Sequence, residues 1–287
     1  MPLRDVDAAQ ISLTIQRSGH TSTSAGESQG ISSAPNLRDI GGYLTRDGHR
    51  VRTGIVYRSS ALHQLAGGDA AAFARLGIRT VYDLRSDPER QAQAEQLPKG
   101  TNYVVADVIG GAVRGGFAQL TEMLTNPALA RELLGDGRGI SMWTDLYRDF
   151  VRLDSARDAY RRLFTGIAGE VNRPALYHCS TGKDRTGWAT AALLLLLDVP
   201  YELVMKDFLR SAIYLRPLVE PMTDAFAAQG GDPELLQPFL GIVPGYLDAA
   251  RDEVSRSFGT IEGYFAVGLN VDATMQKALR EALLVRD

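Results

Sequence analysis

The sequence predicts an α/β fold: a central, mostly parallel sheet flanked by helices, with a helical lid and a C-terminal helical region. Short apolar runs typical of buried strands alternate with helical patterns over residues 54–197, which favours layers of helices on a sheet. A glycine-containing loop joins one such strand to an almost uncharged helical stretch over residues 174–197. Ligands of α/β sheets gather at the carboxyl ends of strands, so this loop is the first candidate for a site.

The N-terminal residues 1–30 are expected to form a strand and a flexible loop ahead of a single domain. Residues 11–15 alternate apolar and polar side chains, and residues 18–30 are rich in Ser, Thr and Gly. One domain is then expected over residues 31–287, with a lid at roughly residues 200–250. Turn residues and β-rich pieces over residues 36–59 predict a small antiparallel element.

The remaining elements follow from apolar periodicity and stop signals. Asp69 is predicted to cap a short helix that Gly77 ends. Strands are expected over residues 78–84, 103–109 and 174–177, and helices over residues 117–134, 154–167 and 186–197. Beyond Pro200 only helical patterns remain, broken by prolines and glycines between residues 217 and 244, and we interpret them as lid and packing helices.

Composition excludes several classes of protein. With 45% hydrophobic and 23% charged residues the chain can build a large core, and its net charge of −3 disfavours a nucleic-acid or membrane-surface partner. One cysteine excludes a disulfide framework, makes a structural zinc cluster unexpected and fits a reducing compartment. No apolar run has the length of a signal peptide core or a membrane span. The expected location is the cytoplasm, with secretion without a cleavable signal left open.

The loop over residues 178–187 has the residues of a thiolate phosphate-binding loop. A thiol attacks phosphorus only as a thiolate, so Cys179 needs surroundings that lower its pKa below about 8.5. Backbone N–H groups from Ser180 to Arg185 can curve into an anion-binding nest, and the following helix points its positive end at the same place. The predicted phosphate-binding residues are Ser180, Thr181, Gly182, Lys183, Asp184 and Thr186.

Separate chemical roles are expected within this loop. Arg185 follows Cys179 after five residues, which lets its planar guanidinium hold two phosphate oxygens. Gly182 permits a positive φ or a close backbone approach. Thr186 can donate a hydrogen bond to the sulfur as it leaves, and His178 is expected to orient the loop through hydrogen bonds.

Two other interpretations of the loop are a buried core cysteine and a nucleotide-binding loop. A lone cysteine is most often a buried core residue, but a core cysteine seldom has Gly182, Arg185 and Gly187 around it in a strand, loop and helix. A Walker-type nucleotide loop is excluded because Tyr177 replaces its first glycine and Asp184 its Ser or Thr.

Three blocks of sequence resemble a known family. They are Asn36-Leu37-Arg38-Asp39-Ile40-Gly41-Gly42 with Tyr57-Arg58-Ser59 downstream, Tyr82-Asp83-Leu84-Arg85-Ser86, and residues 178–187. They are similar to the Cys-x5-Arg protein tyrosine phosphatase superfamily, and within it to the bacterial tyrosine phosphatase family typified by mycobacterial protein tyrosine phosphatase B. The resemblance extends over most of the chain from Asn36 onward, and its loop motif is highly specific.

The resemblance implies a two-step mechanism without metal or cofactor. Cys179 matches the nucleophile and Arg185 the clamp, a phospho-cysteine forms and is then hydrolysed by water, and a helical lid covers the site. The first candidate for the general acid is Asp83, which ends a predicted strand at the same sheet edge. Asp184, inside the loop, is the second candidate for the general acid. In that case Asp83 has no catalytic role and pairs with Arg85 or Arg58.

Other polar residues have weaker expected roles. Asp39 and Asp107 are lesser candidates for the acid. Arg38 and Asp39 can bind one another or support the loop from behind, and the second role is favoured because neighbouring glycines imply tight packing. Arg58 is expected to be structural, although it can assist with an anionic substrate.

The expected substrate is a phosphorylated protein or a phosphoinositide. Phosphotyrosine leads, and phosphoserine, phosphothreonine and inositol lipids follow, because Lys183 puts an extra cation at the loop mouth or is simply solvated. A catalytically silent phosphate-binding module is one alternative. A sulfurtransferase or arsenate reductase is another, although a reductase normally needs further cysteines. No oligomeric state is predicted.

Overall fold

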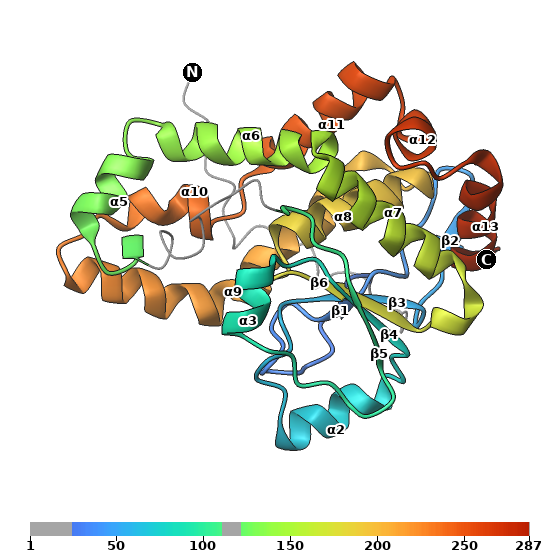
Figure 1. Ribbon diagram of the computed structural model, residues 1–287, viewed down its shortest axis with the longest axis horizontal. Coiled ribbons are helices and arrows are strands. Elements are labelled where there is room, and N and C mark those ends of the chain that lie inside the picture. Colours follow the sequence, from blue (N-terminus) through green and yellow to red (C-terminus); the bar gives the residue numbers. More distant parts are fainter. Residues whose placement is uncertain (1–24, 111–121, 287) are drawn as a thin grey trace, which may run out of the picture.

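The fold was analysed in a computed structural model, which describes residues 25–110 and 122–286 (Figure 1). The strand predicted over residues 11–15 lies outside these residues, and so does the first part of the helix predicted over residues 117–134. Of the predicted N-terminal loop, Ser28 is described and forms an antiparallel bridge with Arg38.

A five-stranded sheet forms the centre of the molecule and confirms the predicted α/β class. Its strands lie in the order β1-β3-β6-β4-β5. The pairs β3–β6, β6–β4 and β4–β5 are parallel, whereas β1 is antiparallel to β3. The strand bounds are β1 Arg38–Asp39, β3 Val56–Ser59, β4 Thr80–Asp83, β5 Asn102–Val105 and β6 Ala175–His178.

A second sheet of two strands was not predicted. β2 (His49–Val51) pairs antiparallel with β7 (Leu284–Arg286), near the C-terminus. Only helical patterns were expected beyond Pro200, and that expectation was wrong at β7. A strand of three residues is too short to show a period, and its pairing with β2 is a tertiary contact that periodicity does not contain.

The two faces of the central sheet build two hydrophobic cores. Along β6, Tyr177 packs into the larger core with the long helices, whereas Leu176 packs into the smaller core with α2 (Gly67–Arg75). On β4, Tyr82 and Val81 divide in the same way. Alternation along a strand therefore explains why every residue of both strands is buried.

Helices cover both faces of the sheet, most of them on the side of the larger core (Figure 1). Besides α2, the helices within the described residues are α3 Asp87–Ala92, α5 Pro127–Leu134, α6 Arg138–Arg152, α7 Asp154–Ala168, α8 Asp184–Leu196, α9 Tyr201–Ala228, α10 Gln237–Leu240, α11 Pro244–Phe258, α12 Ile261–Gly263 and α13 Ala273–Leu283. Short helical turns span Glu170–Asn172, Pro233–Leu236 and Tyr264–Gly268.

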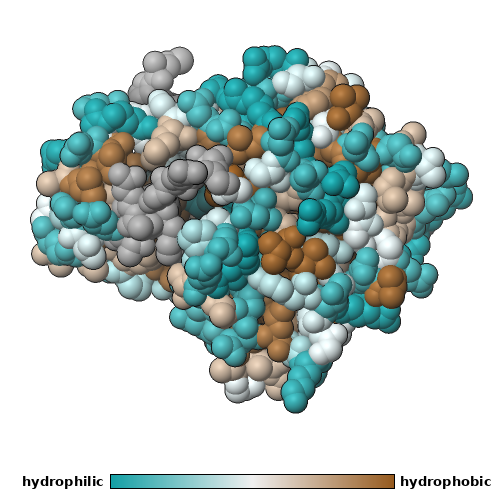
Figure 2. All heavy atoms as spheres, viewed as in Figure 1, coloured by the Kyte–Doolittle hydropathy of each residue, from teal (hydrophilic) through white to brown (hydrophobic). Residues whose placement is uncertain are grey.

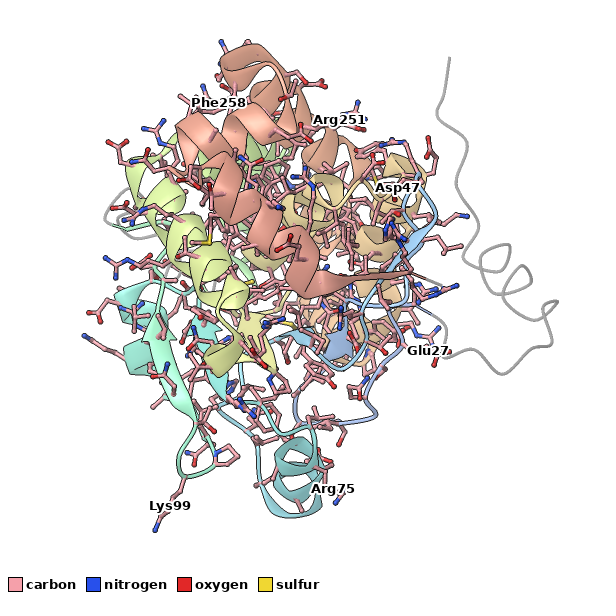
Figure 3. All side chains as sticks on the ribbon, turned by 90° about the vertical axis from the view of Figure 1, so that its right-hand side faces the viewer. Glu27, Asp47, Arg75, Lys99, Arg251 and Phe258 are labelled. Carbon is pink, nitrogen blue, oxygen red and sulfur yellow. The ribbon has the colours of Figure 1, made fainter. Side chains whose placement is uncertain are left out.

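Helices α2 and α11 lie at opposite ends of the molecule. Figure 3 shows Arg75 of α2 and Lys99 at one end and Arg251 and Phe258 of α11 at the other. On the face drawn in Figure 2, hydrophilic residues dominate and apolar ones form separate small patches. Within the described residues, no helix has both the length and the apolar character that crossing a bilayer requires.

Two predicted helix boundaries need correction. The first helix begins at Gly67, and the Asp69 carboxylate accepts hydrogen bonds from the Ser32 hydroxyl (2.9 Å) and the Ser33 N–H (2.8 Å) instead of capping the helix. α9 continues through Pro217 and Pro221, which were predicted to break it. Both prolines are exposed, so solvent can bond the carbonyls that lose an N–H partner.

Candidate active site

The loop after β6 lies at the carboxyl edge of three neighbouring strands. β6 ends at His178, Cys179 follows, and α8 begins at Asp184. Ser59 at the end of β3 and Asp83 at the end of β4 are both in register with His178. The sheet therefore places the cysteine where parallel α/β folds bind ligands, with its side chain buried.

The carbonyl groups of four consecutive loop residues are held by donors that lie outside the anion-binding nest. The His178 ring donates from Nδ1, Ala61 from its backbone N–H, Asn36 from its side-chain amide and Arg58 from its guanidinium. The bonds are His178 Nδ1 to Cys179 O (3.0 Å), Ala61 N to Ser180 O (3.0 Å), Asn36 Nδ2 to Thr181 O (3.2 Å) and to Gly182 O (2.9 Å), and Arg58 Nη2 to Gly182 O (2.7 Å).

The N–H groups of the same loop have the opposite setting. Within residues 25–110 and 122–286, no carbonyl or side chain accepts a hydrogen bond from the N–H groups of Ser180 to Lys183. Since the carbonyls are turned toward the protein, these donors are available to an anion beside Cys179. The positive end of α8 adds to the same attraction.

Glycine is required at position 182. Its φ is +67°, and a Cβ there would lie 2.3 Å from the carbonyl oxygen of Ser59. The expectation of a positive φ with close backbone approach is therefore met by the geometry.

Arg185 is oriented by a glutamate that sequence reasoning missed. Its Nη1 and Nη2 each donate to a different carboxylate oxygen of Glu89, both at 2.7 Å. The Ser180 hydroxyl also donates to Glu89, at 2.5 Å. Burial raises the pKa of Glu89, but its bonds with Arg185 and Ser180 outweigh burial and hold that pKa well below its usual range. The guanidinium is thus fixed beside the loop by an ionised carboxylate.

A local signal for Glu89 exists in the sequence. Ser86 and Glu89 form a capping box at the start of α3, and the Ser86 N–H donates to the Glu89 carboxylate at 2.9 Å. That signal predicts a helix start. It does not predict that the same carboxylate reaches Arg185, 96 residues further along the chain.

Asp83 lies at the predicted sheet edge, in an ionic setting. Its carboxylate accepts hydrogen bonds from Arg85 Nη2 (2.7 Å), from the Arg85 backbone N–H (2.9 Å) and from the Tyr103 hydroxyl (2.6 Å), and it is fully buried. Burial raises its pKa, but His178 and Arg85 outweigh burial and lower it. This pairing with Arg85 is the non-catalytic role that the sequence leaves open for Asp83.

Asp83 belongs to a cluster with Glu95 and His178, whose ligand atoms lie within 4.8 Å of one another. These residue types can hold a metal ion. Here Arg85 pairs with both carboxylates, so its guanidinium already supplies the positive charge that a metal would bring. His178 Nε2 lies 3.9 Å from Asp83 and 3.7 Å from Glu95, while Nδ1 holds Cys179 O. The cluster therefore suits the orientation of His178 better than metal binding.

Asp184, the rival acid, has different partners. The Tyr147 hydroxyl donates to its Oδ1 at 3.0 Å, and Lys183 Nζ lies 3.5 Å from the same oxygen. Its side chain is 20% exposed, so it remains accessible at the first turn of α8. Burial and Asp184 together raise the pKa of Tyr147 well above its usual range, which keeps the phenol protonated and donating.

Comparison with known proteins decides the family. The profile of the tyrosine phosphatase family matches residues 30–285, which is most of the chain. The chain belongs to the tyrosine phosphatase family.

Three relatives of this phosphatase show how far the similarity extends. A provisionally named tyrosine-protein phosphatase of Cupriavidus necator is 28% identical over 240 residues, covering 83% of this chain and 82% of the relative. The triple specificity protein phosphatase PtpB of Mycobacterium tuberculosis is 29% identical over 253 residues, covering 80% and 89%. A tyrosine-protein phosphatase of Nostoc commune is 27% identical over 159 residues, covering 55% and 48%.

Two further loop residues, Lys183 and Thr186, differ in their hydrogen bonds. Lys183 is buried, and its Nζ donates to the carbonyls of Phe239 (2.5 Å) and Gly241 (3.0 Å), at the end of α10. The segment expected as a lid thus contacts the loop. The Thr186 hydroxyl is buried without a hydrogen-bond partner among the described residues.

The two residues expected to support the loop divide in function. Arg38 does not bind Asp39: its guanidinium pairs with Asp207 of α9 and also donates to the side-chain oxygen of Asn36. Asp39 accepts from the N–H groups of Gly41 and Gly54, and so holds a turn. The structure therefore connects Arg38 to the loop through Asn36, whereas Asp39 joins its own turn to the segment that precedes β3.

Asp107, the other lesser candidate for the acid, binds its own turn. Its Oδ1 accepts from the N–H groups of Ile109 (3.1 Å) and Gly110 (2.8 Å), and its Oδ2 lies 3.8 Å from Arg90.

Proposed function

We propose that this tyrosine phosphatase hydrolyses phosphomonoesters, phosphotyrosine first, through a phospho-cysteine formed on Cys179. The observation that carries the proposal is the orientation of the loop: the carbonyls of residues 179–182 are bonded to protein donors, while the N–H groups of Ser180 to Lys183 are left for an anion. Such a nest favours both a thiolate and a bound phosphate.

The reaction then follows from the positions of the side chains. The Cys179 thiolate attacks phosphorus, the S–P bond forms, and the P–O bond to the leaving oxygen breaks. Arg185, held by Glu89, stabilises the charge on the phosphate oxygens in the transition state. An acid protonates the leaving oxygen. The same residue, now deprotonated, takes a proton from the water that next attacks phosphorus, and the S–P bond breaks to release phosphate and the thiolate.

For the general acid we favour Asp184 over Asp83. An acid must carry a proton and reach the leaving oxygen. Asp83 is buried and bonded to Arg85 and Tyr103, which supports a structural role for it. Asp184 begins α8 directly after the nest and is partly exposed, with the neutral Tyr147 hydroxyl as its hydrogen-bond donor. The dependence of the rate on the leaving group distinguishes the two assignments.

A broader substrate range is the second candidate. One relative is named a triple specificity protein phosphatase, which supports a substrate range wider than phosphotyrosine. The further substrates that we propose are those expected from the sequence, namely phosphoserine, phosphothreonine and a phosphoinositide. The burial of Lys183 against the carbonyls of Phe239 and Gly241 gives less support to an inositol lipid. To bind a second phosphate, this side chain must first leave both carbonyls.

The test of the proposed function is hydrolysis of p-nitrophenyl phosphate and of a phosphotyrosine peptide with EDTA present. The wild type is expected to turn over both substrates and to trap label from ³²P-phosphotyrosine peptide on the protein after acid quench. Cys179→Ser is expected to retain the wild-type thermal unfolding midpoint and to lose both turnover and label. Full turnover by this variant, or phosphate binding by the wild type without any turnover, would overturn the proposal.

A further inference from the structure

A buried ionic cluster lies behind the phosphate loop, on the side away from Asp83. Asp207 of α9 faces Arg38 of β1 and Arg58 of β3, and all three are at most 1% exposed. Arg58 Nη1 donates to Asp207 Oδ2 at 2.6 Å, and Arg38 Nε donates to Asp207 Oδ1 at 3.2 Å. The Tyr43 hydroxyl donates to the same Oδ1 at 3.0 Å.

The cluster reaches the loop through two routes that both end on carbonyls. Arg58 places Nη1 on Asp207 and Nη2 on Gly182 O, so a single guanidinium joins the carboxylate to the loop. Arg38 donates to the side-chain oxygen of Asn36, whose amide donates to the carbonyls of Thr181 and Gly182. The hydrogen bonds on these two carbonyls therefore depend on where the two arginines sit.

The electrostatics identify Asp207 as the residue on which this arrangement depends. Two buried guanidinium groups repel each other, and burial together with Arg38 lowers the pKa of Arg58. Asp207 supplies the negative charge between them. Burial raises its own pKa, but Arg38 and Arg58 outweigh burial and bring it to about 2. Removal of one partner from a buried ionic cluster leaves the others uncompensated, and they move.

We infer that Asp207 is a positioning residue for the proposed reaction. It holds Arg58 directly, and Asn36 through Arg38, against the carbonyls of Thr181 and Gly182, so that the neighbouring N–H groups face the phosphate. The inference rests on the proposed function. It also assigns a task to α9, which packs against α8 and leads toward the segment that binds Lys183.

Gly182 is the place where the loop is most able to change. Without Cβ, glycine exchanges between backbone conformations more readily than any other residue. If its carbonyl loses the donors Arg58 and Asn36, the peptide between Gly182 and Lys183 can rotate. The carbonyl oxygen would then point toward the thiolate and the phosphate, and one N–H donor would be lost from the nest.

The experiment uses Asp207→Asn in the full chain, with inorganic phosphate as the probe. Affinity is measured as protection of the thiol from iodoacetamide by phosphate, and thiol ionisation as the pH dependence of alkylation without phosphate. Cys179 is the only cysteine of the chain, so alkylation reports on it alone. Phosphate affinity is expected to fall by about 10- to 100-fold, the loss that corresponds to one or two charge-assisted hydrogen bonds, and kcat/KM for p-nitrophenyl phosphate is expected to fall with it.

The direction of the pH shift separates positioning from a charge effect. If Asp207 positions the loop, the alkylation transition moves to higher pH in Asp207→Asn, because the thiolate loses donors. If Asp207 acts only through its negative charge, the transition moves to lower pH, because two arginines near the loop are left less compensated. The second result overturns the inference.

Glu253→Gln is the matched control. Glu253 is a buried carboxylate of α11 at 3% exposure, and it accepts hydrogen bonds from Arg256 and Ser257. This variant is expected to lower the thermal midpoint and to leave phosphate affinity and the alkylation transition unchanged. If Asp207→Asn behaves in the same way, the role of Asp207 is structural and the inference is wrong.

Two further comparisons keep the test informative. Asn36 has a φ of 68°, so glycine is the replacement that fits its backbone. Asn36→Gly removes the amide that bonds Thr181 O and Gly182 O, together with the oxygen that accepts from Arg38, so it is expected to weaken phosphate binding in the same direction even where Asp207→Asn folds poorly. Unchanged phosphate affinity in a folded Asn36→Gly, with Asp207→Asn unfolded, overturns the inference. If the wild type binds phosphate but hydrolyses no substrate, the proposed function fails while the comparison of affinities still decides the role of Asp207.

Discussion

Asp83 at the end of β4 and Asp184 at the start of α8 flank the same loop, but their carboxylates have different partners. Asp83 is fully buried and bonded to the guanidinium of Arg85. Asp184 is partly exposed and bonded to the neutral phenol of Tyr147. The β4 side of the loop thus carries carboxylates fixed by arginines, and Glu89 with Arg185 repeats the pattern. The side toward α6 carries a carboxylate with neutral and cationic neighbours.

The difference shows why position at a strand end does not by itself identify a general acid. A guanidinium stabilises the ionised carboxylate and lowers its pKa, as at Asp83, so such a group seldom carries a proton at neutral pH. A carboxylate that orients an arginine and a carboxylate that donates a proton have opposite electrostatic needs. The partner of each carboxylate is therefore more informative than its place in the sequence.

The largest effect is expected at Asp184. On a phosphotyrosine peptide, whose leaving group needs a proton, Asp184→Asn is expected to lower kcat by about 100-fold or more, the usual contribution of general acid catalysis. On a dinitrophenyl phosphate, whose leaving group needs none, the loss is expected to be below about tenfold. Asp83→Asn is expected to lower kcat by similar small factors on both substrates. Steady-state kinetics on the two substrates measures these ratios.

Protein stability supplies the control for that pair. Asp83→Asn removes one of the two carboxylates that pair with the buried Arg85, so it is expected to lower the free energy of unfolding by about 3 kcal/mol. Asp184→Asn is expected to lower it by less. If Asp83→Asn instead shows the loss that depends on the leaving group and Asp184→Asn does not, Asp83 is the acid and Asp184 has the structural role.

A smaller effect is expected on the β4 side of the loop, at Glu89. Glu89→Gln removes the charge that holds both Nη atoms of Arg185, and phosphate affinity and kcat are expected to fall by about 10- to 100-fold. Ser86→Ala is the matched control, because it removes the serine hydroxyl, which donates to Glu89 at 2.7 Å in the α3 capping box, but keeps the Glu89 charge and both of its bonds to Arg185. Equal losses in the two variants would mean that Glu89 matters only through the helix cap.

The sequence predicted most of the fold because its strong signals are local. The strand, loop and helix around Cys179 appear at the predicted place, as do β4 and α7. Helix α6 was not among the predicted elements, and two other failures depend on distant contacts. β7 forms only because β2 is beside it, and α9 crosses two prolines because they face solvent.

The residues of the candidate site also differ in whether their roles depend on local sequence or on distant contacts. Cys179, Gly182 and Arg185 share one loop, so their spacing could be interpreted directly. Glu89 binds Arg185 of that loop across 96 residues, whereas Asp207 acts on the loop through Arg58, which lies 149 residues from it in the sequence. An isolated acidic residue on a helix has no local pattern that distinguishes a partner of a buried arginine from a solvated surface charge. Such residues become visible only when the fold brings the charges together.

The smallest expected effect lies on the side toward α10. Lys183 Nζ holds the carbonyls of Phe239 and Gly241, so Lys183→Met is expected to increase hydrogen exchange of backbone amides in residues 237–244, because fewer bonds then keep that segment closed on the loop. Hydrolysis of p-nitrophenyl phosphate is expected to change by less than about tenfold, the worth of one such bond. Lys206→Met, which changes an exposed lysine of α9, is the matched control and is expected to alter neither quantity.

A different pattern would assign Lys183 to the substrate: unchanged exchange in residues 237–244 together with a selective loss of activity on a phosphoinositide. The lysine would then be a binding residue that leaves both carbonyls when a second phosphate arrives, and the helical side of the loop would set specificity as well as supply the acid.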